Sequence, residues 1–172
     1  MKIDPSGYNI NPKAKAALIG AACRLPGARN EQDFWSLLKN GRCTVGPLPQ
    51  GRWRPERYLH PRMTEPGFSY SFAGGYLDDP FSFDPSVFGI SPREARQIDP
   101  QQRLLMEVVW EALEDAGLKP SSLAGQEVGV YVGASSLDYG NLHMTDPASI
   151  ESHFMTGNTL SIVSNRLSYI FD

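Results

Sequence analysis

The 172 residues of the chain suffice for one ordinary domain with a sizeable hydrophobic core. Hydrophobic residues make up 41% of the sequence and charged residues 20%, which excludes a disordered or fibrous chain. The net charge of −3 argues against nucleic acid or an anionic membrane as a partner.

The cysteine spacing and the lengths of the apolar runs bear on where the protein is located. Cys23 and Cys43 have no CxxC spacing and no nearby paired histidines, so we predict neither a metal site nor a disulfide framework. No apolar run is long enough to span a bilayer, and the N-terminus lacks the charged-then-apolar order of a signal peptide. We therefore expect a cytoplasmic protein.

The N-terminal part predicts a leader, a strand and a helix. Residues 1–15 are polar and contain Pro5, Gly7 and Pro12, which is typical of a leader or linker. Residues 16–22 (AALIGAA) form a short apolar run that favours a strand buried on both faces. A short helix follows at residues 30–40, with Asn30 as its N-cap.

A long excursion rich in proline and aromatic residues extends over about residues 42–90. Its length predicts a functional loop or an interaction surface rather than a simple connection. A disordered linker would be poor in aromatic residues, whereas this segment contains Trp53, Tyr58, Phe68, Tyr70, Phe72, Tyr76, Phe81, Phe83 and Phe88. We expect an ordered excursion that wraps the body of the fold.

Two consecutive helices follow, and the second is the most clearly patterned part of the chain. Ser91 and Glu94 form a capping box for a short helix. In residues 98–117, Asp99 is the predicted N-cap, Pro100 fits the first helical position, and Gln102 completes a capping box with Asp99. The predicted core-facing side consists of Leu104, Leu105, Val108, Val109, Ala112, Leu113 and Ala116, with Arg103 and the acidic residues on the solvent side.

The remaining residues predict a second strand and a final helix. Residues 128–132 (VGVYV) favour a buried strand, so that the order strand, helix, strand indicates an α/β fold with parallel pairing. Residues 135–147 predict a loop, residues 148–155 a short helix, and Leu160, Val163 and Leu167 lie on one stripe of a last helix. Because two strands give little sheet for these helices to cover, we expect the chain to be the first part of a larger domain.

Five sequence blocks occur in the order found in a known family. They are ALIGAACRLPGA, DFWSLLKNGR, GGYLDDPFSFDPSVFGISPREARQIDPQQRLLMEVVWEALEDAG, VGVYVGASSLDYG and TGNTLSIVSNRLSYIFD. From about residue 17 to 172 the chain resembles the N-terminal portion of the β-ketoacyl synthase (ketosynthase) domain of modular polyketide synthases. The resemblance implies a partial thiolase-like fold, the N-terminal part of a five-layered α-β-α-β-α domain, at residues 16–172.

The resemblance also implies an activity and partners. Family members condense an acyl chain, held as a thioester on a cysteine, with a malonyl-type extender, in a decarboxylative step that forms a carbon–carbon bond. The extender arrives on the phosphopantetheine arm of an acyl carrier protein, so no cofactor binds the ketosynthase directly. The expected partners are the carrier protein, the remainder of the ketosynthase domain and a second copy in a homodimer or in self-association.

The catalytic groups of the family lie outside the residues that match. The family nucleophile sits in a DTACSS-type motif shortly after the NRLSY helix, and two histidines follow much later; none of these motifs occurs in this sequence. We therefore assign no catalytic residue and expect the chain alone to be inactive. The alternative is a naturally truncated, non-catalytic remnant that serves as an interaction or assembly module.

Position within the family suggests a substrate contact and a partner contact. Phe154 and Met155 lie where relatives place residues of the dimer interface that reach toward the partner's acyl pocket. A series of arginines lies in the excursion: Arg42, Arg52, Arg54, Arg57 and Arg62. The series is explained either by contact with an acidic carrier protein or by an ordinary solvated face with local ion pairs. Cys23 suits a small apolar filler better than a reactive thiol.

Overall fold

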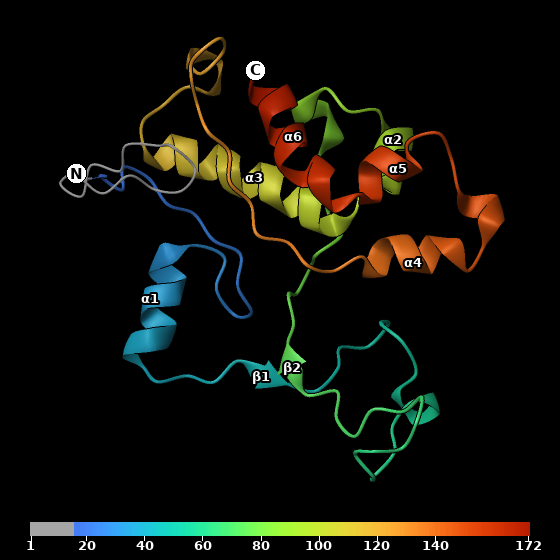
Figure 1. The fold of residues 1–172 in the computed structure, drawn as a ribbon. Coiled ribbons are helices and arrows are strands. Elements are labelled where there is room, and N and C mark those ends of the chain that lie inside the picture. The colour runs from blue at the N-terminus through green and yellow to red at the C-terminus, as the bar shows by residue number, and fades with distance from the viewer. Residues whose placement is uncertain (1–15) are drawn as a thin grey trace, which may run out of the picture.

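The computed structural model describes residues 16–172, so the leader predicted at residues 1–15 lies outside the described residues. A helical body and two smaller parts beside it make up the described chain (Figure 1). The α-helices are α1 (Glu31–Lys39), α2 (Pro92–Gln97), α3 (Pro100–Asp115), α4 (Asp138–Met144), α5 (Phe154–Asn158) and α6 (Leu160–Phe171). Short 3₁₀ turns occur at η1 (Pro55–Arg57), η2 (Pro85–Phe88), η3 (Pro120–Ser122) and η4 (Pro147–Ser149).

The three predicted N-caps are confirmed. The side chain of Asn30 accepts a hydrogen bond from Asp33 N at 2.8 Å, and Ser91 Oγ accepts one from Glu94 N at 3.1 Å. Asp99 caps α3 by accepting from Gln101 N at 2.8 Å, with Pro100 in the first helical position. The predicted capping box with Gln102 is wrong, because the Gln102 side chain turns into the core to meet Gly157 O instead.

The two predicted strands are extended segments without strand partners. Within residues 16–172, the strands are a short antiparallel pair, β1 (Val45–Gly46) and β2 (Gly74–Gly75). Residues 16–22 lie against the C-terminal end of α3, where Ala21 N donates to Asp115 Oδ2 at 2.9 Å, and Leu18 is 88% exposed. A strand needs a neighbouring strand to satisfy its backbone, and no described segment supplies one.

Residues 128–132 depart from the prediction in a similar way. Val130 and Val132 pack against the core, whereas Tyr131 between them is 96% exposed. The segment thus covers the α3–α6 pair with alternate side chains, as a strand does, while its other face is bare. The prediction of a strand buried on both faces is wrong for residues 16–22, and that of a buried strand is wrong for residues 128–132.

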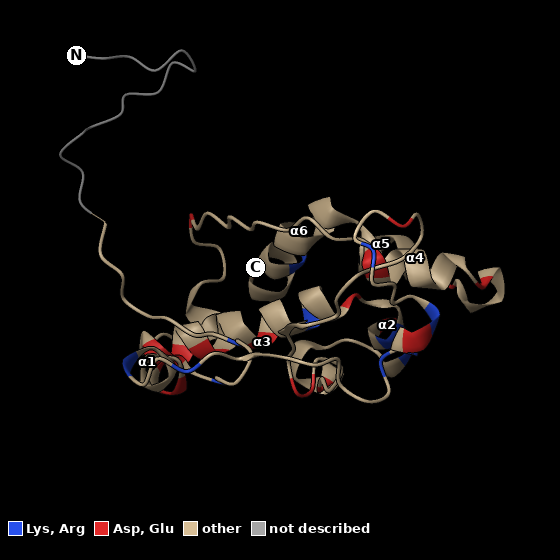
Figure 2. Ribbon diagram, turned by 90° about the horizontal axis from the view of Figure 1, so that it is seen from below, with Lys and Arg blue, Asp and Glu red and all other residues tan. Residues whose placement is uncertain are grey.

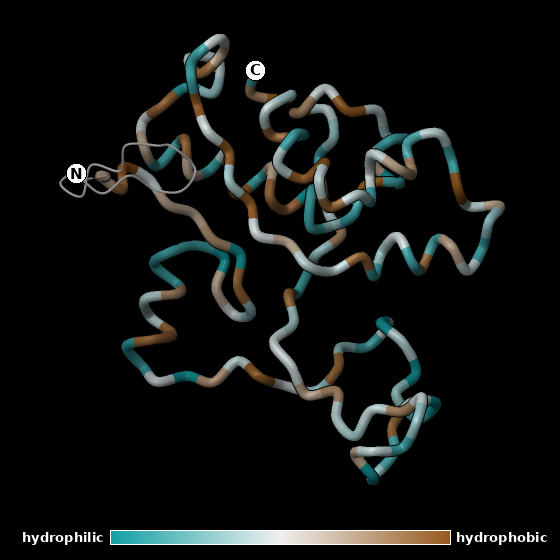
Figure 3. The backbone as a smooth tube through the Cα atoms, in the orientation of Figure 1, coloured by the Kyte–Doolittle hydropathy of each residue, from teal (hydrophilic) through white to brown (hydrophobic). Residues whose placement is uncertain are grey.

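The core lies where α2, α3 and α6 meet. Its buried members are Ile90, Ala95, Ile98, Met106 and Leu167, of which Ile98 is completely buried. Figure 3 shows apolar and polar residues alternating along these helices, as in amphipathic helices that bury one side. The solvent side predicted for α3 is wrong for Arg103, which is 8% exposed and donates to Phe81 O in the excursion. Gln102 beside it is 2% exposed and turns toward α5 and α6.

The excursion divides into two parts. Residues 50–72 form a lobe that stands away from the helices and is joined to them through the β1–β2 pair (Figure 1). Phe83 and Phe88, which stack with ring centroids 5.4 Å apart, lie against the core beside Trp110 of α3.

Of the helices in residues 16–172, none has the length and apolar character needed to cross a bilayer.

Candidate functional site

The segment Thr156-Gly157-Asn158 lies at the junction of α2, α3, α5 and α6. Gly157 O accepts a hydrogen bond from Asp99 N at 2.9 Å, which ties α5 to the start of α3. A Cβ on Gly157 would stand 2.2 Å from Gln97 O, a separation that real Cβ atoms do not show. Glycine is therefore required here for the close approach of two backbone segments.

A buried arginine connects the helices around this junction. Arg166 is 9% exposed and is the one charged residue of α6 (Figure 2). Its Nε donates to Gln102 Oε1 at 2.7 Å, its Nη1 donates to Glu94 Oε1 at 2.9 Å, and its Nη2 donates to Thr156 O at 3.3 Å. Gln102 Nε2 in turn donates to Gly157 O at 2.8 Å. The buried charge is thus paired and its neighbours are hydrogen-bonded, as burial of an ion requires.

Asn158 completes the junction. Its Nδ2 donates to Gln97 O at 2.9 Å and to Phe154 O at 2.8 Å, which fixes the orientation of the amide. The Oδ1 atom is then left buried without a hydrogen-bond partner among the described residues. It faces Gly140 of α4, where a Cβ would lie 3.5 Å from it. The contact brings α4 close to the junction.

Phe154 and Met155, the residues predicted to contact substrate, lie on one cavity beside the junction. Phe154 is 5% exposed and meets the ring of His143 with centroids 6.1 Å apart, whereas Met155 is 67% exposed. The cavity has a volume of about 360 Å³ and a largely apolar lining. Its other walls are Leu137, Gly140, Asn141, Met144, Asn158, Thr159, Leu160 and Ser161.

One wall of this cavity was not predicted. Residues 135–147 were expected to form a loop, but α4 occupies Asp138–Met144. Gly140 lowers helix propensity and hides the pattern, although Leu137, Asn141 and Met144 recur at helical spacing. The helix predicted at 148–155 is also misplaced, because α5 begins only at Phe154.

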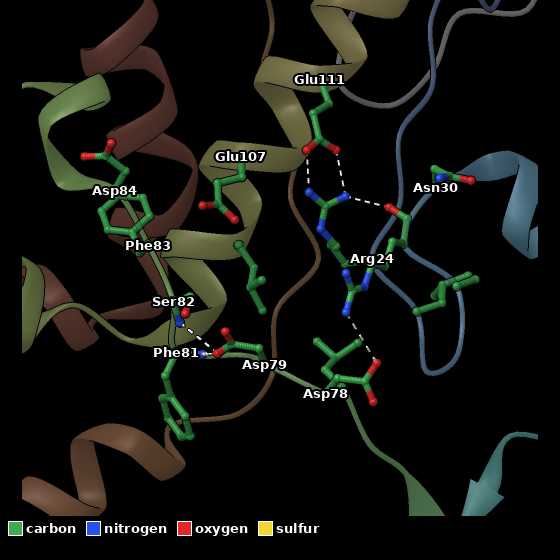
Figure 4. A pocket seen from close by; sticks show the side chains of 15 residues that line it. Arg24, Asn30, Asp78, Asp79, Phe81, Ser82, Phe83, Asp84, Glu107 and Glu111 are labelled. Atoms are coloured by element: carbon green, nitrogen blue, oxygen red, sulfur yellow. Dashed lines mark hydrogen bonds and ion pairs between the residues drawn. The ribbon is translucent and has the colours of Figure 1, made fainter.

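A polar cleft of about 980 Å³ lies between α3 and the excursion (Figure 4). Arg24 forms a bidentate ion pair with Glu111 at its wall and donates to Arg29 O at 2.6 Å. Glu107 lies one helical turn away, and burial raises the pKa of its carboxyl, with smaller contributions from Glu111 and Asp79. Sequence reasoning missed this cleft because its walls come from segments far apart in the chain.

Hydrogen bonds hold the opposite wall of the cleft. Asp79 Oδ1 accepts from Ser82 N at 3.0 Å and from Phe81 N at 3.3 Å. The Ser82 side chain, as the largest contributor, and the two backbone N–H groups lower the pKa of the Asp79 carboxyl by hydrogen bonding to it. Glu111 thus faces an arginine and Asp79 a loop turn, an arrangement typical of structural ion pairs, whereas Glu107 has no hydrogen-bond partner among the described residues.

The cysteines and histidines do not gather into a reactive centre within the described residues. Burial and the nearby Glu31 raise the pKa of the Cys23 thiol, which keeps the thiol protonated at neutral pH. Cys43 is exposed, and both cysteines are free. In residues 16–172 no cluster of three His, Cys, Asp or Glu side chains has a geometry suited to a metal ion.

The arrangement of helices is that of part of a ketosynthase domain with the thiolase-like α/β fold. The structure resembles the oxazolomycin ketosynthase domain OzmH KS7 of Streptomyces albus JA3453 with a TM-score of 0.80 and 36% identity, over 90% of this chain and 27% of that one. It also resembles the ketosynthase from module 6 of the bacillaene synthase of Bacillus subtilis 168, with a TM-score of 0.77 and 34% identity, over 90% of this chain and 24% of that one.

The sequence comparisons agree with the structural ones. The profile of the family "Beta-ketoacyl synthase, N-terminal domain" matches residues 13–172, and the chain belongs to this family. Polyketide synthase GfsB of Streptomyces halstedii is 48% identical over 157 residues, 90% of this chain. The mycocerosic acid synthase-like polyketide synthase of Mycolicibacterium smegmatis is 47% identical over 161 residues, 92% of this chain. The chain spans 3% and 8% of the lengths of these two relatives.

Proposed function

We propose that the chain supplies the N-terminal part of a polyketide synthase ketosynthase. The observation that carries the proposal is the family match over residues 13–172, together with the TM-score of 0.80 to a ketosynthase domain. The complete enzyme would carry out a decarboxylative Claisen condensation. In this reaction the acyl chain, held as a thioester on the enzyme's cysteine, is joined to the malonyl thioester of an acyl carrier protein. The products are a β-ketoacyl carrier protein and carbon dioxide, and the enzyme's cysteine is released as a thiol.

In this reaction the chain acts as scaffold. The DTACSS-type motif of the family nucleophile does not occur in its sequence, and the raised pKa of Cys23 makes that thiol a poor substitute. The chain alone is therefore inactive, and the remainder of the domain supplies the reacting groups. A homodimer, a carrier protein with its phosphopantetheine arm and a location in the cytoplasm belong to the same proposal, and the free cysteines suit such a reducing compartment.

Phe154 and Met155 are proposed to contact the acyl chain. They line the apolar cavity of about 360 Å³ between α4 and α5, and the exposed Met155 thioether is free to reach toward a second copy. Methionine adapts its shape to different apolar ligands. The junction around Gly157 fixes the backbone that carries both side chains.

The proposal is tested by following the coding sequence beyond Asp172 and expressing the joined product. We expect a DTACSS motif and, with acyl thioester and malonyl carrier protein, release of carbon dioxide and a β-ketoacyl product detected by mass spectrometry. The 172-residue chain should give no product in the same assay. A stop codon directly after Asp172 would instead favour the non-catalytic assembly module, and condensation by the short chain would contradict the scaffold role.

A further inference from the structure

The lobe formed by residues 50–72 has its own hydrogen-bonded frame. His60 N donates to Ser69 O at 2.8 Å, and Ser69 N donates to Tyr58 O at 2.7 Å, so two distant parts of the lobe are held side by side. The turn η1 precedes this bridge. The lobe stands away from the helical body in Figure 1, and its hydropathy is mixed in Figure 3. Its exposed face is thus ordered and accessible in the described chain.

Aromatic side chains form an open dish on this lobe. Trp53, Tyr58, Phe68 and Phe72 line a shallow depression of about 510 Å³ together with Gly67 and Ser69. Trp53 and Phe72 meet edge to face with centroids 5.5 Å apart, which fixes the dish floor. Trp53 is 46% exposed and Tyr58 is 48% exposed. An exposed cluster of large apolar side chains is typical of an interaction site.

The charge of the lobe is opposite to that of the chain. Residues 50–72 contain four arginines and two glutamates, a net charge of +2 in a chain of net charge −3. Arg52 is occupied, since it donates to Leu77 O and lies over the Phe81 ring at 5.4 Å. Arg54 and Arg57 are exposed, and within residues 16–172 neither takes part in an ion pair.

We propose that the lobe is the docking surface for an acidic protein partner, with Arg54 and Arg57 pairing with its carboxylates and the dish receiving an apolar side chain. Tryptophan, tyrosine and arginine are the residue types most enriched at binding hot spots, and opposite charge directs the encounter. If the proposed function holds, this partner is the acyl carrier protein. The rest of the chain, with a net charge of −5, repels an acidic partner from other faces.

The test measures binding of a fluorescently labelled apo acyl carrier protein to the full 172-residue chain by anisotropy. The double variant Arg54→Glu/Arg57→Glu should raise the dissociation constant about tenfold or more, because two exposed charge pairs become repulsive. The matched control is Lys119→Glu, an exposed cation next to η3 in a different part of the fold. Trp53→Ala should also weaken binding, whereas Trp35→Ala on α1, 67% exposed in the parent chain, should not.

Several results would overturn the docking surface. They are a dissociation constant unchanged by the double variant, equal weakening by Lys119→Glu, or equally tight binding of RNA or of anionic phosphatidylserine vesicles. Binding of the arm-bearing holo carrier protein without binding of the apo form would also overturn it, since the arm and not the protein face would then be recognised. Far-UV circular dichroism of each variant confirms that it is folded.

The two proposals can fail independently. Suppose that the joined enzyme condenses and that the double variant leaves its rate at low carrier-protein concentration unchanged. This result would contradict the docking surface and leave the enzyme function standing. Suppose instead that the double variant weakens binding of the carrier protein but the joined enzyme gives no condensation product. This result would contradict the enzyme function and leave the docking surface standing.

Discussion

Glu107 and Glu111 lie on consecutive turns of α3 and differ in their partners. Glu111 receives both Nη groups of Arg24, whereas Glu107 makes no side-chain hydrogen bond within the described residues. Burial therefore dominates at Glu107 and raises its carboxyl pKa above the ordinary value of 4.5. The folded state binds a proton here more tightly than the unfolded state does, which links this one residue to the pH dependence of stability.

The variant Glu107→Gln should be more stable than the parent chain at pH 7, because glutamine avoids the cost of burying a charge. The advantage should shrink as pH falls through the raised folded pKa and vanish below about pH 4.5, where the parent carboxyl is protonated in both states. Urea unfolding followed by circular dichroism between pH 4 and pH 8 measures the difference. The exposed Glu127→Gln serves as control, and a Glu107→Gln variant less stable at pH 7 would show that Glu107 has a partner that needs its charge.

At the scale of elements, Arg166 is the link among α2, α3 and α6. It joins Glu94, Gln102 and Thr156, which are 72, 64 and 10 positions away in sequence. Such contacts leave no local pattern, so the sequence predicted α2, α3 and their caps but not the junction between them. α4 was missed for a related reason, because Gly140 weakens its local signal while Asn158 and Phe154 of distant segments stabilise it.

Arg166→Met should destabilise the chain by about 2–3 kcal/mol, because Glu94 and Gln102 lose their partner in a buried setting. Arg166→Lys should recover only part of this loss, since one ammonium group cannot replace three directed donors. The free energy of unfolding from urea titration checks both values. The exposed Arg96→Met is the matched control and should change stability by no more than about 0.5 kcal/mol; an equal effect of the two Met variants would contradict the role of the junction.

At the scale of the whole molecule, the main departure from expectation concerns the sheet. The apolar runs at residues 16–22 and 128–132 have the composition of buried strands, and the second one packs Val130 and Val132 onto α3 and α6 as a strand would. Composition predicts the tendency of a segment to be extended. The hydrogen-bond ladder of a sheet, however, also depends on a second strand beside that segment. Among residues 16–172 the backbone of residues 129–132 makes no hydrogen bond, and Val128 and Tyr131 are 55% and 96% exposed.

The chain should therefore self-associate through this edge. An extended segment with free N–H and C=O groups and a neighbouring apolar groove, about 330 Å³ in volume, is a template for pairing with another chain. Sedimentation velocity should show a concentration-dependent increase in mass. Tyr131→Lys should shift the distribution toward monomer, because a charge on a strand edge opposes pairing, whereas Tyr169→Lys, at an 87% exposed site on α6, should not. A monomer at every concentration would show that residues 128–132 do not offer a pairing edge in solution.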